Sequence, residues 1–114
     1  MIPDLRNSYI KQPSEQIPIE VNFGSLSILP RGAKEIISTN AISKRRKRSN
    51  PDIVEPAPEF LVSATPTILT PTRCKIRFYV MGGQDGYDYQ VTVQATFDTG
   101  AQLEEEIHVR VVER

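Results

Sequence analysis

The residues whose types could do chemistry gather in one short stretch, GGQDGYDYQV at positions 82–91. Glycines next to aspartates can cradle a phosphate group, and loop carboxylates can bind calcium. A phosphate-binding loop closes with a lysine and a serine or threonine, and no such ending follows these glycines. A calcium loop of the EF-hand type needs more acidic residues than Asp85 and Asp88 and ends in a glutamate. The stretch therefore predicts neither a phosphate site nor a metal site.

The other residues that often carry catalysis are scarce, because His108 is the only histidine and Cys74 the only cysteine. His108 lies between two apolar residues, and we expect it on the solvated face of a strand. Cys74 begins an inward-facing series, where a thiol acts as a small apolar side chain. One cysteine and one histidine cannot make a structural zinc site within one chain. The sequence predicts a protein that is not an enzyme and that uses no metal and no cofactor.

Chain length, net charge and cysteine count limit the kind of protein this can be. The chain has 114 residues, which corresponds to one domain, and its 14 basic and 14 acidic residues cancel. The net charge therefore favours neither nucleic acid nor a membrane surface. A single cysteine excludes an intrachain disulfide, which favours a reducing compartment or a particle assembled in one. No apolar run approaches the ~20 residues of a membrane helix, and the first residues lack the apolar core of a signal peptide.

Alternation of apolar and polar residues predicts strands along most of the chain. It is clearest in QIPIEVNF (16–23), CKIRFYVM (74–81), YQVTVQATF (89–97) and LEEEIHVRVVE (103–113). EFLVSA (59–64) predicts a further short strand, and TPTILTPT, which follows it, predicts a link. Residues 33–43 could form a strand or a helix, and their β-branched residues favour the strand. Short strands separated by proline and glycine turns predict an all-β fold, an immunoglobulin-like β-sandwich of about six to seven antiparallel strands.

The last two strands predict a hairpin with Thr99, Gly100 and Ala101 as its loop. In that register Phe97 faces Leu103 and Tyr89 faces Val111. A two-residue loop would instead place a glutamate opposite Val93 on the core face. A slip of one residue exchanges the two faces of a strand, so the three-residue loop is favoured.

A structural corner is predicted before the strand that contains Tyr89. Asp85, Gly86, Tyr89 and Val91 match the D-x-G/A-x-Y-x-C pattern of immunoglobulin domains, with valine in the place of the cysteine. In that pattern the tyrosine hydroxyl bonds to backbone a few residues upstream. The structural corner therefore consists of Asp85, Gly86 and Tyr89.

Two segments lie outside this strand pattern. Residues 1–16 predict an extended N-terminal arm preceding a β-sandwich domain over residues 17–114, and residues 44–58 predict an exposed basic and proline-rich loop without regular structure. The loop begins with KRRKR. That block fits a solvated loop, a docking patch for an acidic protein, a nucleic-acid contact or a nuclear localisation signal. The rest of the chain is net acidic, which argues against nucleic acid.

The glycine–tyrosine pattern also carries a resemblance. Gly82, Gly83, Gly86, Tyr89 and Val91–Thr92, with the closing HVRVVE, resemble small Ig-like bacteriophage virion proteins, such as fibre–tail adaptors and neck–tail connectors. The resemblance covers residues 17–43 and 59–113, and is weaker in the first half. It implies a structural protein in several copies that is assembled in the host cytoplasm and joins the tail or neck to tail fibres or to neighbouring ring proteins.

An adaptor of this kind needs contact surfaces, and the sequence predicts two of them. One is the arm, with apolar anchors, and the other is the basic loop facing an acidic protein surface. The expected partner-binding residues are Ile2, Leu5, Tyr9 and Ile10 in the arm, and Lys44, Arg45, Arg46, Lys47 and Arg48 in the loop. A capsid decoration (cement) protein of the same fold is the first alternative. A nucleic-acid-binding or nuclear protein acting through KRRKR is the second.

Overall fold

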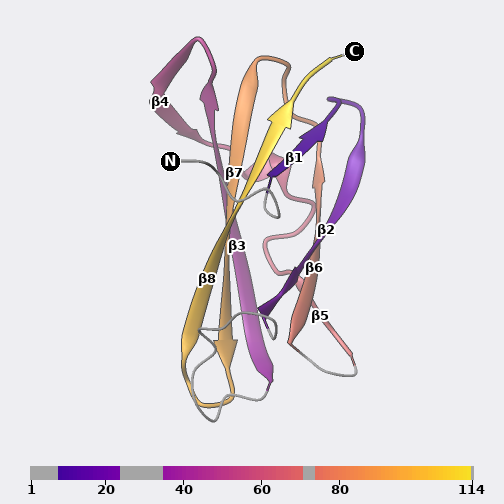
Figure 1. Cartoon of the computed structure of the whole chain (residues 1–114), viewed down its shortest axis with the longest axis vertical. Helices are drawn as coiled ribbons and strands as arrows, with labels where there is room; N and C mark the ends of the chain where they lie inside the picture. Colours follow the sequence, from indigo (N-terminus) through magenta and orange to yellow (C-terminus); the bar gives the residue numbers. More distant parts are fainter. Residues whose placement is uncertain (1–7, 24–34, 71–73, 114) are drawn as a thin grey trace.

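Eight strands and one short 3-10 helix form the regular structure of residues 8–23, 35–70 and 74–113, the part of the chain that the computed structural model describes (Figure 1). The all-β prediction is confirmed. In chain order the elements are β1 (Ser8–Lys11), β2 (Gln16–Asn22), β3 (Ile36–Lys47), β4 (Asn50–Pro56), the helix η3 (Pro58–Phe60), β5 (Thr67–Leu69), β6 (Lys75–Met81), β7 (Tyr87–Phe97) and β8 (Gln102–Val111).

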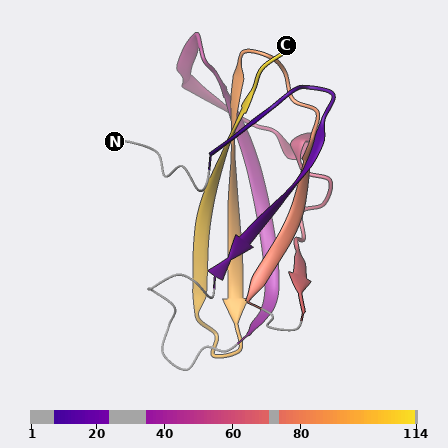
Figure 2. The ribbon, with the colours of Figure 1, turned by 45° about the vertical axis from the view of Figure 1, so that its right-hand side comes forward.

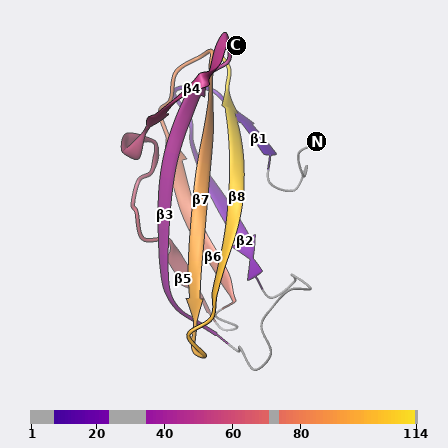
Figure 3. The same ribbon diagram turned by 90° about the vertical axis from the view of Figure 1, so that its left-hand side faces the viewer.

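The strands form two sheets that pack face to face. The larger sheet has the order β1-β8-β7-β3-β4, and the smaller sheet has the order β2-β6-β5. The strand orders β8-β7-β3 and β2-β6-β5 are those of an immunoglobulin-like sandwich. Figure 3 shows the long strands β3, β7 and β8 side by side, with the smaller sheet behind them. One pairing differs from the antiparallel prediction, because β1 runs parallel to β8.

The core lies between the two sheets and follows the alternation of the sequence. Along β7 every second residue from Tyr89 to Phe97 is buried, and β6 and β8 show the same period. A side-chain period of two leaves one face of each strand to solvent. The buried apolar side chains include Ile19, Val21, Phe23, Ile36, Phe60, Ile76, Phe78, Val80, Val91, Val93, Ile107, Val109 and Val111.

The β7–β8 hairpin has a three-residue loop, but the predicted register is wrong by two residues. Tyr89 pairs with Val109 and Ala95 with Leu103. The loop is Asp98–Gly100, because the N–H of Phe97 donates to the carbonyl of Ala101 over 2.8 Å and the N–H of Gly100 to that of Phe97 over 2.8 Å. Gly100 has a φ of 86°, the left-handed conformation that closes such loops in their third position. A shift of two residues keeps each side chain on its predicted face.

Several local predictions are corrected by the structure. Residues 59–64 are not a strand, since η3 ends at Phe60 and only Leu61 makes a single bridge to Val80. The link after it contains β5, which pairs with β6. The undecided segment 33–43 becomes a strand from Ile36 onward. Cys74 precedes β6 and is only half-buried. The sequence SLSILPRG at residues 25–32, which predicts a turn, lies outside the described residues.

The predicted basic loop and arm are also partly regular. Residues 44–56 form an antiparallel hairpin, with a bulge at Arg46/Lys47, because β4 pairs back onto the end of β3. Residues 8–11 form β1, so this part of the arm belongs to the larger sheet. Gln12–Glu15 then connect β1 to β2 in the smaller sheet, and the N–H of Glu15 donates to the carbonyl of Gln12 over 3.1 Å. The sandwich therefore begins at Ser8, nine residues earlier than the predicted boundary at residue 17.

Candidate functional site

The β3–β4 hairpin projects from the end of the sandwich where the described chain ends (Figures 1 and 2). Its base is fixed by the N–H of Ala57, which donates to the carbonyl of Ser43 over 3.0 Å. Six of the seven β4 residues are exposed. Two of them are large apolar residues, Ile53 at 57% and Val54 at 45% exposure. The hairpin therefore displays apolar and basic side chains together, at a distance from the core.

The five basic residues of KRRKR do not form one patch, because a strand turns alternate side chains to opposite faces. Lys44 and Arg46 lie on the outer face of the larger sheet, and Lys47 is exposed near the turn. Arg45 points inward, with its guanidinium carbon 4.5 Å from the centroid of the Tyr87 ring. Its Nε lies 3.5 Å from Oε1 of Glu55, and a hydrogen bond with the Tyr89 side chain raises the pKa of Arg45. Arg45 thus has contacts within its own fold.

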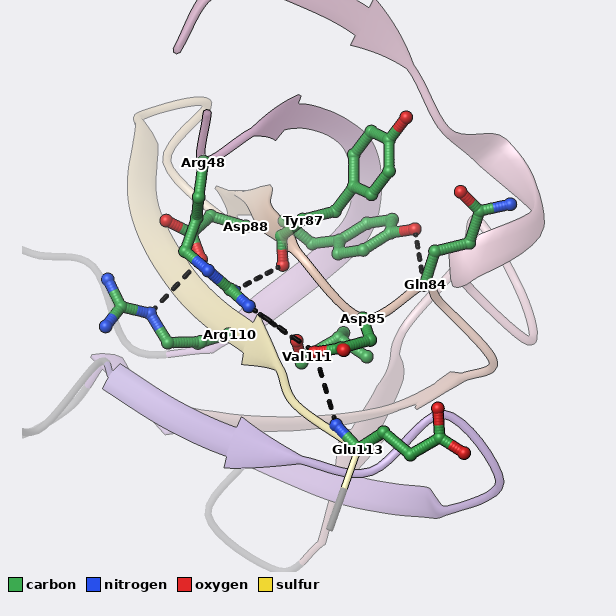
Figure 4. Close-up of polar contacts among 9 residues, drawn as sticks. Arg48, Gln84, Asp85, Tyr87, Asp88, Arg110, Val111 and Glu113 are labelled. Atoms are coloured by element: carbon green, nitrogen blue, oxygen red, sulfur yellow. Dashed lines mark hydrogen bonds and ion pairs between the residues drawn. The ribbon is translucent and has the colours of Figure 1, made fainter. Parts of the chain in front are cut away.

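Arg48 joins the hairpin turn to the ends of two other strands (Figure 4). Its Nη1 donates to Oδ1 of Asp88 over 3.0 Å and to the carbonyl of Tyr87 over 3.2 Å. Its Nη2 donates to the carbonyl of Val111 over 3.2 Å. Its backbone N–H donates to the carbonyl of Gly86 over 2.8 Å. Four contacts to β7, β8 and the glycine loop hold the turn in one orientation.

The two aspartates that contact Arg48 also contact β8 and the residues that follow it. Nε of Arg110 lies 3.2 Å from Oδ1 of Asp88, so two guanidinium groups bind one carboxylate. Asp85 lies 3.6 Å from Nη2 of Arg48 and accepts a hydrogen bond from the N–H of Glu113 over 3.3 Å. The two aspartates of the opening stretch therefore connect β3, β8 and the residues after β8. No group of three or more histidine, cysteine, aspartate or glutamate side chains within the described residues could hold a metal ion.

The corner residue Tyr89 makes the contact that the tyrosine pattern predicts. Its hydroxyl accepts a hydrogen bond from the N–H of Gln84 over 3.1 Å. Its ring stacks on Phe60 with 4.0 Å between centroids. Gly83 packs between these rings and β8, with a φ of 92°, so its position suits a residue without a side chain. The corner fixes the approach of the chain to β7 and, through it, the position of Asp88.

The arm residues fall into two groups. Ile2 and Leu5 lie outside the described residues. Tyr9 is half-buried against the core, whereas Ile10 is 61% exposed on the outer face next to Arg110. A surface groove of about 490 Å³ is lined by these two β1 residues together with Ser8, Asp88, His108, Val109 and Arg110. Its charged groups Asp88 and Arg110 already bind each other, and His108 is exposed as predicted.

Sequence reasoning missed Lys11, which is almost completely buried at the end of β1. Its Nζ donates to the carbonyls of Gln12 and Gly82, each over 2.6 Å, and lies 5.9 Å from the centroid of the Phe60 ring. Burial lowers the pKa of Lys11. The alternation of SYIK places Tyr9 and Lys11 on one face, which was a signal for an inward lysine. The two hydrogen bonds tie the β1–β2 turn to the loop after β6.

Comparison with known proteins gives no family for this chain, since neither a protein-family model nor a curated protein matches its sequence. The described residues contain no helix that is long and apolar enough to cross a membrane. The surfaces of the sandwich therefore carry what can be inferred about function.

Proposed function

We propose that this chain is a structural protein of a bacteriophage particle, an adaptor that joins the tail or neck to tail fibres or to neighbouring ring proteins. It acts by binding alone, in several copies, after assembly in the host cytoplasm. The observation that carries the proposal is the projecting β3–β4 hairpin, which exposes Ile53 and Val54, and in which Val54 pairs with Arg46. Exposed apolar side chains bordered by charge are typical of protein contact surfaces.

The hairpin suits this role because its own sandwich holds it in place. Arg48 binds Asp88 and the carbonyls of Tyr87 and Val111, so the turn is oriented before any partner arrives. A surface that is already ordered loses less conformational entropy on binding. The cations near it favour an acidic partner surface and set the orientation of approach.

The N-terminal arm is the second proposed contact. Ile10 is exposed on β1, and Ile2 and Leu5 precede it in the sequence. In the proposal these three side chains bind a neighbouring virion protein, while Tyr9 anchors the arm to its own core.

The test is to locate the chain in particles whose genome encodes it. Immunogold labelling of an epitope-tagged chain is expected at the tail or neck, in several copies. The double substitution Ile53→Asp and Val54→Asp is expected to leave a folded chain that is absent from particles. A matched control is Ile37→Asp, which changes an exposed apolar residue at the other end of β3 and leaves incorporation intact.

Other outcomes would replace the proposal. Label spread over the shell, with weaker particles when the chain is lost, would make the chain a capsid decoration protein. Duplex DNA binding with a log–log salt slope of about −3 to −5 would indicate several phosphate contacts and a nucleic-acid function through KRRKR. Absence of the chain from purified particles would contradict both structural roles.

A further inference from the structure

Apart from the Asp88–Arg110 ion pair and His108, the charged side chains on the outer face of β3, β7 and β8 lie in two separate clusters of opposite sign. The register places Lys44 opposite Gln90 and Arg46 opposite Asp88. On the other side of β7, Glu106 is opposite Thr92 and Glu104 is opposite Gln94. All these residues share the solvent face of the sheet. Two cations therefore lie on β3 toward the hairpin, and two carboxylates lie on β8 toward the opposite end.

Neither cluster is neutralised by its own chain within the described residues. Lys44 and Arg46 have no carboxylate partner there, because Asp88 already binds Arg48 and Arg110. Glu104 accepts only a long hydrogen bond of 3.4 Å from Nε2 of Gln94. Glu106 lies 3.9 Å from Nε2 of His108, which supplies a charge only when protonated.

Ile42 lies between these clusters and is 66% exposed, the highest value among the large apolar residues that the structure describes. It shares the outer face with Lys44, two residues along β3, and is opposite Thr92. A single exposed isoleucine is common on protein surfaces. Ile42 matters here because it lies at about the same distance from both charged clusters.

The arrangement is self-complementary under a two-fold rotation. Neighbouring strands are about 4.8 Å apart and alternate residues of one strand about 6.8 Å apart. On that spacing the two charged clusters lie diagonally across β7, on either side of Gln90 and Thr92. Consider a two-fold axis that lies in the plane of the face, crosses the diagonal at its midpoint and is perpendicular to it. Rotation by 180° about this axis places the cation pair of each copy on the carboxylate pair of the other copy. The same axis passes over Ile42 and His108, so each of these meets its own counterpart.

We propose that this outer face binds the same face of a second copy of the chain, as a two-fold symmetric dimer. The proposal goes beyond the adaptor function and holds whether or not the chain belongs to a particle. Two-fold contacts are the commonest among soluble homo-oligomers. Near the axis, the large exposed apolar side chains of the described residues are Ile42 and Ile10, which lies on the same face opposite Arg110. The apolar contact is small, so the dimer is weak, and its two ion-pair clusters make it sensitive to salt.

The charge arrangement is tested by exchanging the two clusters. In sedimentation experiments at low ionic strength the wild type is expected to form dimers, and to dissociate as salt is raised. Lys44→Glu with Arg46→Glu makes both clusters acidic, and Glu104→Lys with Glu106→Lys makes both basic, so each variant alone is expected to be monomeric. An equimolar mixture of the two variants is expected to dimerise again. Circular dichroism and melting curves check that each variant folds.

The position of the axis is tested by cross-linking. Packed sheets lie about 10 Å apart, farther than a disulfide spans, so a short bis-maleimide reagent is used. In a Cys74→Ser background, Ile42→Cys is expected to give covalent dimers. Ile53→Cys is the control, because Ile53 is similarly exposed but lies on the hairpin, away from the axis.

Three results would overturn the proposal. One is a wild-type chain that stays monomeric at low salt and high concentration. Another is a dimer that persists in both charge-reversed variants, since it would use a different face. The third is cross-linking that is equal for Ile42→Cys and Ile53→Cys.

Discussion

Replacing Gly83 by alanine tests how closely the corner packs on the rest of the sandwich. A Cβ at Gly83 would lie 2.8 Å from Cγ2 of Val111, 3.2 Å from Cε1 of Phe60 and 3.3 Å from Cε1 of Tyr89. Gly86 is a matched control, because it has the same φ of +92° and its Cβ would meet no heavy atom of the described residues within 4 Å. The two substitutions share the backbone strain and differ in packing.

The expected changes in the free energy of unfolding follow from backbone strain and packing. An L-residue in the left-handed region costs about 1–2 kcal/mol, and this applies to both alanines. Overpacking a well-filled site costs about 1–3 kcal/mol, and this applies only to Gly83→Ala. The smaller conformational entropy of unfolded alanine offsets about 0.4–1 kcal/mol in both cases and cancels in the comparison. Gly83→Ala is therefore expected to lower the free energy of unfolding by about 1–3 kcal/mol more than Gly86→Ala.

Urea unfolding followed by circular dichroism measures this difference, provided that the slope of the free energy against urea is unchanged between variants. Val111 is held by its pairing with Lys11 of β1, and the rings of Phe60 and Tyr89 stack on each other, so these neighbours have little room to move. Equal unfolding free energies for the two alanine variants, within about 0.5 kcal/mol, would refute the close packing of the corner.

Three further predictions concern the contacts around this corner. Tyr89→Phe leaves the N–H of Gln84 without its acceptor, and thermal melts should show that the free energy of unfolding falls by about 1–2 kcal/mol. An unchanged melting temperature would contradict a stabilising role for the Tyr89–Gln84 hydrogen bond. Arg48→Met removes charge-assisted hydrogen bonds of a partly exposed side chain and should cost about 1–3 kcal/mol in urea unfolding, whereas Arg46→Met should stay within about 0.5 kcal/mol. For Lys11, burial lowers the pKa in the folded state, so the unfolded chain holds the proton more tightly. The free energy of unfolding should therefore gain a contribution as pH rises from the lowered folded pKa toward the ordinary lysine pKa. Urea titrations at pH values across that window should find the gain absent in Lys11→Met, and the same gain in both chains would contradict the assignment.

The alternation of the sequence was enough to predict which side chains of β6, β7 and β8 face the core, because a period of two is a local property. It was not enough to fix the register of the β7–β8 hairpin. Registers that differ by two residues keep the same faces, so only the turn can choose between them. The choice depends on Gly100 in the third loop position, with its φ of 86°. Placing the glycine in the middle of the loop produced the error.

The basic block shows a different limit. Its charge predicted exposure, yet the same five residues divide between two faces and a turn once β3 pairs with β7 and β4. Arg48 acquires its role from partners 39 to 63 residues away in the sequence, which no local pattern reveals. Lys11 is similar, since Gly82 is 71 residues away. Contacts of that range follow from the fold rather than from composition.

The edges of the two sheets narrow the ways in which this chain can associate. An exposed edge strand can recruit another strand through its backbone groups, and prolines, short strands and inward charges prevent this. β4 contains Pro51 and Pro56, β2 contains Pro18, and β5 has only three residues. β1 has four residues and ends in the inward Lys11. All four edges thus disfavour strand addition, so association is left to side-chain surfaces, of which the projecting hairpin and the outer face around Ile42 carry the clearest complementarity.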